Sequence, residues 1–593
     1  MKNKLQTLLL GTILSISNIS AFDYSSYSAG YADSDYREAL NMGLKFFGGQ
    51  RCGNTHNWML HDNSGVSKKY CHTKDGQGKV NGGGNGNYDL TGGWHDCGDH
   101  IKVATTMGYA ATSLLVAYDI WPEAFQDNYD GEYGAPNGIP DVLDEAKIAT
   151  DYFIKSFVDD NTFVYYVGDH TDHNEWRTSS AQSDLSVDKG GDPRAVWTTS
   201  DKGGPQAAGY AAALAIMARR YPDKEYQNKC KEYAIKAYNY AVKNKSNHAT
   251  IPTFYPSPNS EWTDELSLAA ILIYQATEDE KYKSDALGYL QGKWESNSPL
   301  AWDTMSDFAY YYIVKSDATA GNGQGGLIAD FLRKNVNVLH IPSGEKDSNG
   351  FPYYKNTWGT NKLACGGAVA AALFLKLVED EVIDAGDANL NKIKNFNLRI
   401  IDYVLGKNEF NHTFLHGFKG DMHFRIHHRN AMGRNDNPPT NVKNSCDFLF
   451  ASGGLIGGPS APGVFQNIIE GGASYTETEG GCDYNAPFVA AIASVVAEKD
   501  PVATTSLNTT NNDLNYNVYP TYFDDYIVAD PIETNCGEES SIQIISINGT
   551  IVKSQNTNKF LPVVFDTSDL PSGNYILLIT TSCGSQKAYK VVK

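Results

Sequence analysis

The sequence predicts two domains of different class: a large, mostly helical domain followed by a small domain of β-strands. From residue 23 to about residue 499, apolar residues recur every three to four positions in roughly a dozen segments, the spacing of helices with a buried face. After a Thr- and Asn-rich stretch at 502–515, short runs alternate between apolar and polar residues, the spacing of half-buried strands. The chain of 593 residues is long enough for both domains.

The N-terminus has the composition of a secretory signal peptide. Lys2 and Lys4 precede an apolar run that extends from Leu5 to Ile16, and small residues lead up to Ala21. The apolar run is too short to span a membrane as a mature helix, and we expect no membrane-spanning stretch elsewhere in the chain. We therefore expect residues 1–21 to be removed and the mature protein to leave the cytoplasm, where disulfides are permitted.

Helical periodicity is regularly spaced along the large domain, which we place at residues 22–500. Examples are residues 36–47, 102–121, 140–157, 206–221, 264–277, 365–377, 390–405 and 486–497. Pro140 suits the start of its helix, because acidic residues follow it in the first turn. Long loops rich in Gly, Asn, Asp and aromatic residues separate these helices, and loops of that kind usually carry function.

Composition narrows the range of partners. The net charge of −20 excludes nucleic acid and anionic membranes as partners, since their phosphates would be repelled. The chain has 37 Tyr, 24 Phe and 9 Trp, and aromatic planes stack on the apolar faces of sugar rings. Large protein cores also use tyrosine, so composition by itself leaves both explanations open.

The most unusual run of the chain is DLTGGWHDCGDHIKV, at residues 89–103. It places the carboxylates of Asp96 and Asp99 three residues apart in a Gly-rich turn, directly after His95. Taken alone, such a turn also suits a helix cap or a calcium site.

Two further motifs favour the interpretation that this turn is catalytic. YTETEGGCDYNAPF, at 475–488, places Glu479 shortly before a predicted helix, and FRIHHRNAMG, at 424–433, contains His427 and Arg429. Carboxylates on both sides of a sugar-binding cleft, with His and Arg to hold hydroxyl groups, are the equipment of glycosidic hydrolysis.

Together these motifs resemble glycoside hydrolase family 9, the inverting cellulases. The family's pattern is a GGW/Y-x-D-A-G-D turn early, an H-x-R stretch late and N-E-x-x-x-D-Y-N-A near the end, and versions of all three occur here in that order. IPDVLDEAKIATDYFIK at 139–155 and EWTDELSLAAILIYQAT at 261–277 are further matches. The resemblance implies an all-α (α/α)6 barrel. It also implies a secreted endo-β-1,4-glucanase that hydrolyses cellulose or related β-glucans with inversion.

The resemblance also implies roles for individual residues. Asp99 would be the general base that activates water, and Asp96 would help to orient that water. Glu479 would be the general acid, which must hold a proton near neutral pH through burial or nearby negative charge. The implied substrate contacts are His427, Arg429, Tyr484 and Trp358.

The chain departs from the family's pattern near the acid and the base. Cys97 stands where the family usually has Ala, and Thr478 stands where Asn is common. Gly480 and Gly481 replace aliphatic residues. We expect these changes to loosen the loop of the acid and so to alter the pKa of Glu479.

A structural zinc ion is the first predicted cofactor. Two thiolates and two imidazoles make a tetrahedral zinc site. A subgroup of the family binds zinc through a Cys, a Cys-His pair and the His directly before the first catalytic Asp, and the spacing here is similar. The implied ligands are Cys52, Cys71, His72 and His95. The alternative is a Cys52–Cys71 disulfide. The chain has nine cysteines, an odd number, so at least one thiol is free or bound otherwise.

A structural calcium ion is the second predicted cofactor. Oxygen ligands from several segments suit calcium. The resemblance implies that the ligands are Ser260, Glu261 by its carbonyl, Asp264, Glu265 and Asp303. Capping of a helix by Thr263 and Asp264 is the alternative, and it can coexist with a calcium site.

The last segment, residues 516–593, follows a linker at 501–515 and resembles the C-terminal sorting domain of type 9 secretion cargo. The resemblance rests on NVYPTYFDDYIV, IISINGTIV, DTSDLPSGNYILLI and KAYKVVK. We expect a β-sandwich with a hairpin turn at Asn548-Gly549 and a disulfide between Cys536 and Cys583. A carbohydrate-binding module is the alternative, but this segment has no Trp.

The predicted partners are a β-glucan substrate and the secretion machinery, and the predicted form is a monomer that is secreted or held at the cell surface. One rival keeps the fold but acts as an exo-acting cellodextrinase or on mixed-linkage glucan or xyloglucan. The other rival is a surface glucan-binding protein without catalysis. The three carboxylates argue against the second rival.

Overall fold

The computed structural model describes most of the chain. The described residues are 22–59, 70–129, 136–245, 249, 262–290, 299–316, 345–346, 349–354, 358–386, 388–431, 451–467, 475–501, 514–519, 526–534, 539–546, 550–558, 563–571, 573–581 and 586–593.

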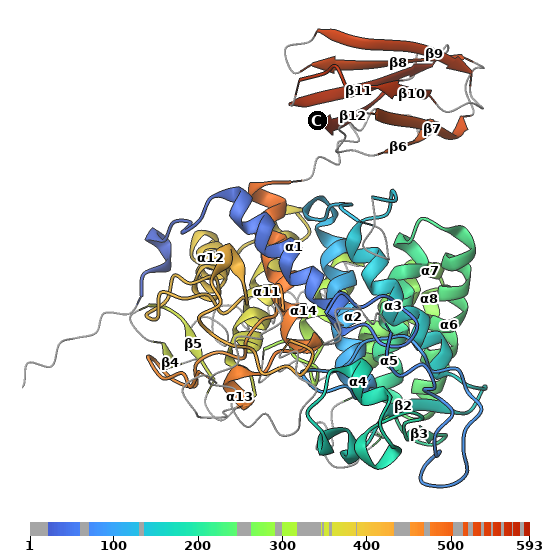
Figure 1. Ribbon diagram of the computed structural model, residues 1–593. Helices are drawn as coiled ribbons and strands as arrows, with labels where there is room; N and C mark the ends of the chain where they lie inside the picture. The colour runs from blue at the N-terminus through green and yellow to red at the C-terminus, as the bar shows by residue number, and fades with distance from the viewer. Residues whose placement is uncertain are drawn as a thin grey trace, which may run out of the picture.

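Six helices form a ring by their packing in the large helical domain, which Figure 1 shows. They are α2 (Ala104–Ile120), α5 (Gly204–Arg220), α7 (Thr263–Thr277), α9 (Ser306–Ser316), α11 (Thr360–Glu379) and α14 (Cys482–Lys499). Each helix packs against the next in this order, and α14 packs against α2 to close the ring.

A second set of helices lies outside the ring. Outer helices α1 (Asp33–Gln50), α3 (Asp141–Ser156), α6 (Lys224–Lys243), α8 (Glu280–Leu290) and α12 (Leu390–Val404) pack against α14, α2, α5, α7 and α11, respectively. The described helices thus form an inner and an outer layer, and the predicted (α/α)6 barrel is confirmed.

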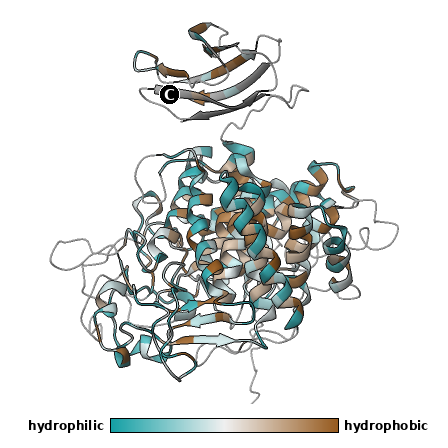
Figure 2. Ribbon diagram, turned by 90° about the vertical axis from the view of Figure 1, so that its right-hand side faces the viewer, coloured by the Kyte–Doolittle hydropathy of each residue, from teal (hydrophilic) through white to brown (hydrophobic). Residues whose placement is uncertain are grey.

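Burial separates the two layers. Fourteen of the seventeen residues of inner helix α2 are buried, but only seven of the twenty residues of outer helix α6. A helix that is apolar on all sides belongs in a core, whereas a helix with one apolar stripe belongs at a surface. Figure 2 shows the same contrast, with apolar residues concentrated on the central helices.

One inner helix also has a membrane-like composition, contrary to the expectation from sequence. Among the described helices, α11 alone is long and apolar enough to cross a membrane. However, 83% of its most apolar stretch is buried inside the protein. Its apolarity therefore follows from its place in the ring, where neighbouring helices cover all of its sides.

The catalytic motifs lie at the end of the ring where α2, α11 and α14 begin. An antiparallel sheet with the order β1-β2-β3 covers this end beside α2. Its strands are β1 (Lys102–Val103), β2 (Phe163–Val167) and β3 (Val196–Thr199). Because β1 directly follows the Asp96–Asp99 turn, the sheet fixes one end of that turn. A small two-stranded sheet is formed by β4 (Glu345–Lys346) and β5 (Pro352–Tyr353).

The C-terminal domain is a sandwich of two antiparallel sheets, with strand orders β10-β7-β6 and β12-β11-β8-β9. The strands are β6 (Leu514–Tyr519), β7 (Tyr526–Thr534), β8 (Glu539–Ser546), β9 (Ile551–Asn558), β10 (Val563–Asp566), β11 (Asn574–Thr581) and β12 (Gln586–Val592). Apolar residues from both sheets form one core, including Ile527 and Phe565 from one and Ile544 and Leu577 from the other. The predicted turn Asn548-Gly549 and the predicted Cys536–Cys583 disulfide lie outside the described residues.

Candidate active site

The turn that carries Asp96 and Asp99 is closed by its own backbone. The amide of Asp96 donates to the carbonyl of Ile101 at 2.9 Å, and the amide of Ile101 donates to Oδ1 of Asp99 at 3.3 Å. The buried carboxylate of Asp96 accepts one hydrogen bond at each oxygen, from the Thr106 hydroxyl and from the Cys97 thiol. The side chain of Asp99 stays 14% exposed, so the more accessible carboxylate of the pair is the predicted base.

Glu479 reaches the same site from a loop between the short helix α13 (Tyr475–Thr478) and α14. Its amide donates to the carbonyl of Tyr475 at 3.0 Å, and the amide of His427 donates to the carbonyl of Thr478 at 2.8 Å. Oε2 of Glu479 accepts a hydrogen bond from the indole Nε1 of Trp358 at 2.7 Å. The backbone therefore fixes the start of the acid's loop, while the indole fixes its carboxyl group.

The loops of the acid and the base are joined directly. The amide of Cys482 donates to the carbonyl of Asp96 at 2.9 Å. A Cβ atom on Gly481 would lie 2.6 Å from Sγ of Cys97 and 2.9 Å from that same carbonyl oxygen. Only glycine permits this approach, so the expected loosening of the acid's loop is wrong. The glycine lets the two loops pack closely.

Burial raises the pKa of the predicted acid, Glu479, and of the predicted base, Asp99. It raises the pKa of Glu479 to about 8, and the nearby Asp99 carboxylate adds to the rise. It likewise raises the pKa of Asp99 to about 7, and the Asp172 carboxylate adds to that rise. Glu479 therefore holds a proton at neutral pH, as a general acid must. Asp99 becomes an available base as the pH passes about 7.

Two members of the site were not foreseen from the sequence. Asp172 is buried beside the turn, and His173 lies between it and the base. Nδ1 of His173 is 3.5 Å from Oδ2 of Asp172, and Nε2 is 3.6 Å from Oδ2 of Asp99. The run GDHTDHNEW, at 168–176, mixes carboxylates, imidazoles and an indole as the catalytic turn does, and this was the available signal.

Arg429 supports the turn from inside the protein. Its buried guanidinium pairs with the Asp172 carboxylate and donates to the Asp172 carbonyl at 2.6 Å. Its amide donates to the carbonyl of Gly98, next to Asp99, at 3.0 Å. Burial opposes ionisation of Asp172, but the Arg429 charge outweighs it and lowers the pKa of that carboxyl. Arg429 is therefore buried next to the predicted base and contacts Asp172 and the Gly98 carbonyl.

The other predicted substrate residues differ in exposure. Trp358 is 51% exposed and lies beside the acid, which suits a sugar platform. The ring of His427 packs edge-on against Trp176 at 4.8 Å and Tyr475 at 4.7 Å. Tyr484 is only 1% exposed, so its ring lies beneath the site and does not form part of its surface.

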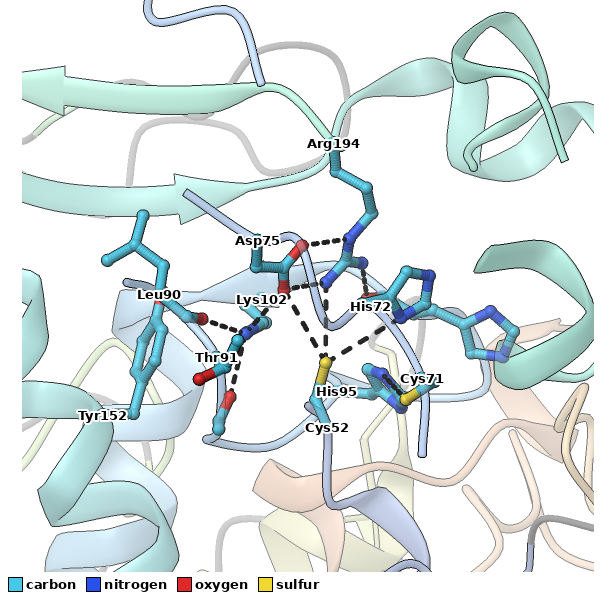
Figure 3. Close-up of polar contacts among 12 residues, drawn as sticks. Cys52, Cys71, His72, Asp75, Leu90, Thr91, His95, Lys102, Tyr152 and Arg194 are labelled. Carbon is cyan, nitrogen blue, oxygen red and sulfur yellow. Dashed lines mark hydrogen bonds and ion pairs between the residues drawn. The ribbon is translucent and has the colours of Figure 1, made fainter. Parts of the chain in front are cut away.

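A buried group of two thiols and two imidazoles, the Cys–His cluster, consists of Cys52, Cys71, His72 and His95. Their ligand atoms all lie within 4.8 Å of one another (Figure 3). Sγ of Cys52 is 3.8 Å from Nδ1 of His72, and Sγ of Cys71 is 3.7 Å from Nε2 of His95. Ligands at the corners of a tetrahedral zinc site are spaced by roughly 3.5 Å, given zinc bond lengths of about 2.0–2.3 Å.

The protonation of this cluster also suits a metal. Burial lowers the pKa of both His72 and His95, which keeps their rings neutral and able to donate a lone pair. Cys52 and Cys71 are free cysteines in the structure. The donor set therefore fits a structural zinc ion by spacing and by chemistry.

The predicted calcium ligands are not assembled to the same degree. Ser260 and Glu261 lie outside the described residues. Of the other three, Asp264 accepts a hydrogen bond from the Met305 amide at 2.7 Å, and burial raises the pKa of Glu265 and of Asp303. Among the described residues, only the Cys–His cluster brings three or more possible metal ligands within 4.8 Å of one another.

Comparisons with known proteins give a family for the large domain. The model of glycosyl hydrolase family 9 matches residues 36–492. Endoglucanase A of Fibrobacter succinogenes is 30% identical over 441 residues, which cover 70% of this chain and 91% of that protein. Endoglucanase A of Bacillus pumilus is 28% identical over 495 residues, which cover 78% of this chain and 67% of that protein.

Solved structures give the same fold. The endoglucanase of the termite Nasutitermes takasagoensis superposes with a TM-score of 0.62 at 27% identity, covering 79% of this chain and 99% of that chain. The cellulase Cel9M of C. cellulolyticum superposes with a TM-score of 0.61 at 24% identity, covering 78% of this chain and 98% of that chain.

The C-terminal sandwich has its own match, since the model of the secretion system C-terminal sorting domain covers residues 517–593. This domain directs the protein to the cell surface or beyond it. The family 9 model spans more than half of the chain, over the barrel that brings the predicted acid and base together. The chain therefore belongs to glycosyl hydrolase family 9.

Proposed function

We propose that this protein is a secreted endo-β-1,4-glucanase that hydrolyses cellulose or related β-glucans with inversion at the anomeric carbon. The observation that carries the proposal is the pairing of Glu479, protonated at neutral pH, with Asp99 on the adjoining loop. The substrate class is supported by the two curated relatives, both of which are endoglucanases.

Glu479 supplies the proton for the leaving group. Because Oε2 accepts the hydrogen bond from Trp358, the acidic proton is carried on Oε1. Oε1 is then the atom that protonates the glycosidic oxygen as the bond to the anomeric carbon breaks. The exposed Trp358 indole stacks on a sugar ring next to that bond and holds it against the acid.

Asp99 takes the balancing proton from water. The water oxygen bonds to the anomeric carbon on the face opposite the departing oxygen, so a β-linkage gives an α-product. Asp96 orients this water and is itself held by Thr106 and Cys97. His173, which contacts Asp99 and is 41% exposed, is placed to hold a sugar hydroxyl beside the base. Proton exchange with solvent restores both carboxyl groups.

Two metal ions complete the proposal. The Cys–His cluster would hold a structural zinc ion, whose role is to tie the loop that contains Cys71 and His72 to the catalytic turn through His95. Asp264, Glu265 and Asp303, together with Ser260 and the Glu261 carbonyl, would hold a structural calcium ion at the start of α7. Elemental analysis of the purified protein tests both assignments. We also propose a monomer, which light scattering tests.

The experiment for the catalytic roles compares Glu479→Gln and Asp99→Asn with Glu477→Gln. Each catalytic variant should lose roughly 10²–10⁴-fold in activity on a soluble β-glucan while keeping the native circular dichroism spectrum. Glu477 is a matched control because it is a buried carboxylate on α13, two residues before Glu479, and accepts a hydrogen bond from the Gln466 amide at 2.6 Å. Activity close to that of Glu477→Gln in either catalytic variant would remove the role assigned to that residue.

Three further measurements test the stereochemistry, the endo-action and the domain division. Proton NMR of early products should show the α-anomer, and a rapid fall in viscosity should accompany few new chain ends; a β-anomer contradicts inversion. A truncated protein that ends at Lys499 should keep its activity on soluble glucan. Loss of that activity would make the C-terminal sandwich part of the catalytic unit.

A further inference from the structure

Arg194 contacts both the catalytic turn and the Cys–His cluster, and Figure 3 shows it beside Asp75 and the cluster. It precedes β3, and its side chain is 2% exposed. Nη1 donates a hydrogen bond to the carbonyl of His100, the residue after Asp99. On its other edge, Nη2 lies 3.7 Å from Sγ of Cys52. One planar group therefore touches the backbone of the turn and a sulfur of the cluster.

A buried carboxylate fixes the orientation of this guanidinium. Asp75 accepts from Nε of Arg194 at 2.9 Å through Oδ1 and from Nη2 at 2.7 Å through Oδ2. Oδ2 also pairs with Nζ of Lys102 at 2.8 Å, and that ammonium group donates to the carbonyls of Leu90 and Gly92. Two-point pairing of this kind sets the plane of an arginine as well as its position.

The charge of Arg194 is balanced by carboxylates. Arg194 and Lys102 both pair with the buried Asp75 carboxylate, and the Asp192 carboxylate also lies near Arg194. A buried cation is costly unless an anion faces it. These carboxylates therefore hold the guanidinium where it reaches both the Cys52 sulfur and the His100 carbonyl.

We propose that Arg194 is a positioning residue that locks the catalytic turn to the Cys–His cluster, so that the cluster and the base share one rigid support. The His100 carbonyl belongs to the peptide unit whose amide, that of Ile101, donates to Asp99. Holding this carbonyl therefore sets the direction from which Asp99 is hydrogen-bonded. The inference rests on the proposed role of Asp99 as the base.

Substitutions of Arg194 separate its geometry from its charge. Arg194→Lys keeps the charge but cannot bind Asp75, Cys52 and the His100 carbonyl together. Arg194→Met removes the charge as well as these contacts. A misplacement of about 1 Å at the turn costs on the order of 10²-fold in rate. We expect kcat to fall by roughly this factor in both variants, with KM nearly unchanged.

The pH profile distinguishes the two variants. The charged and titratable groups that face Asp99 are Asp172, Glu479, Arg429, Arg194 and His173. Since Arg194 lowers the pKa of Asp99, its loss raises that pKa. The acidic limb of kcat/KM should therefore move to higher pH in Arg194→Met but stay in place in Arg194→Lys.

A second readout does not depend on activity. Loss of an outer contact to a metal ligand typically costs roughly 10–100-fold in metal affinity. Zinc should therefore pass faster to a chromophoric chelator from both Arg194 variants. Arg399→Lys is the matched control: Arg399 is equally buried and donates to the carbonyls of Asn349 and Lys407, far from the site.

The outcomes decide between a positioning role and a structural one. The proposal stands if kcat and zinc retention both fall in Arg194→Lys but not in Arg399→Lys. It is overturned if Arg194→Lys and Arg399→Lys have the same kcat and the same zinc retention. It is also overturned if Arg194→Lys fails to fold under conditions where Arg399→Lys folds. A rescue experiment separates loss of the side chain from loss of the fold. Guanidinium ion added to Arg194→Ala should restore part of kcat, and absence of rescue counts against the proposal. Full activity in Asp99→Asn would instead refute the base assignment, which the zinc measurement does not use.

Discussion

The indole Nε1 of Trp358 donates a hydrogen bond to Oε2 of Glu479 over 2.7 Å, which joins an exposed aromatic ring to the carboxyl group of the proposed general acid. Burial and the nearby Asp99 carboxylate raise the pKa of Glu479, whereas this hydrogen bond lowers it. The value of about 8 is therefore a balance of opposing effects. In the proposed mechanism, Trp358 therefore contacts both the sugar and the carboxyl group whose pKa sets the alkaline limit of activity.

Trp358→Phe should move the basic limb of the pH profile to higher pH. The variant removes a donor that favours the charged form of Glu479, so the pKa of that carboxyl rises. A general acid works only while protonated, and activity present below its pKa is lost as the pH rises through it. The measurement is kcat/KM against pH. Trp197→Phe is the control, because the Trp197 indole donates to the Gly168 carbonyl and to no carboxylate. A basic limb that stays fixed or moves down would contradict the prediction.

Asp99→Asn should lower the pKa of Glu479. The Asp99 carboxylate is the largest contribution to that raised pKa after burial, and an amide carries no charge. The titration can be followed by NMR of protein labelled with 13C at the glutamate carboxyl carbon, with the Glu479 signal assigned from its absence in Glu479→Gln. An unchanged or higher pKa in Asp99→Asn would show that the two carboxyl groups do not interact.

The sequence indicated the proposed catalytic carboxylates, which the structure brings to one site, because each lies in an unusual local motif. Asp96 and Asp99 share one short turn, and Glu479 lies directly before a helix. Asp172 was missed because its importance comes from Arg429, which is 257 residues away along the chain. Arg429 itself was identified, but only the structure shows its guanidinium turned toward Asp172.

Packing contacts between segments that lie far apart in the sequence also could not be predicted from local patterns. Helical periodicity identified the apolar inner helices at 206–221 and 365–377, although the second begins earlier, at Thr360, because residues there pack beneath the site. The tightness at Gly481 could not be predicted, since it depends on Cys97 from a distant segment. Local patterns therefore predict elements and motifs, whereas contacts between segments decide how each residue acts.

Gly481→Ala should reduce both activity and stability. The added methyl group would meet Sγ of Cys97 at 2.6 Å and the Asp96 carbonyl oxygen at 2.9 Å, so the loops of acid and base must separate. Overpacking of a buried junction typically costs about 1–3 kcal/mol. Thermal unfolding and kcat would report the effect.

The double variant Gly481→Ala/Cys97→Ala identifies the cause. Removal of the sulfur relieves the shorter of the two contacts. The double variant should therefore be more stable and more active than Gly481→Ala alone. Gly288→Ala on α8 is the control, because an added Cβ there meets nothing within 4 Å. If Cys97→Ala brings no recovery, the thiol is not what the methyl group strikes.

Removal of zinc should weaken the fold and the catalytic turn together. We expect about one zinc ion per chain, and Cys52→Ser should lower both zinc content and melting temperature, because binding free energy at a structural site is folding free energy. Cys365→Ser is the matched control, since Cys365 is a buried free cysteine on α11 and its substitution should leave zinc content unchanged.

Zinc holds thiolates without an oxidant, so a mild reductant should be harmless while a strong chelator lowers the melting temperature. A Cys52–Cys71 disulfide predicts the reverse sensitivity. Protein that contains no zinc, and in which mass spectrometry finds Cys52 linked to Cys71, would replace the metal site with that disulfide and leave His95 as only a neighbour of the catalytic pair.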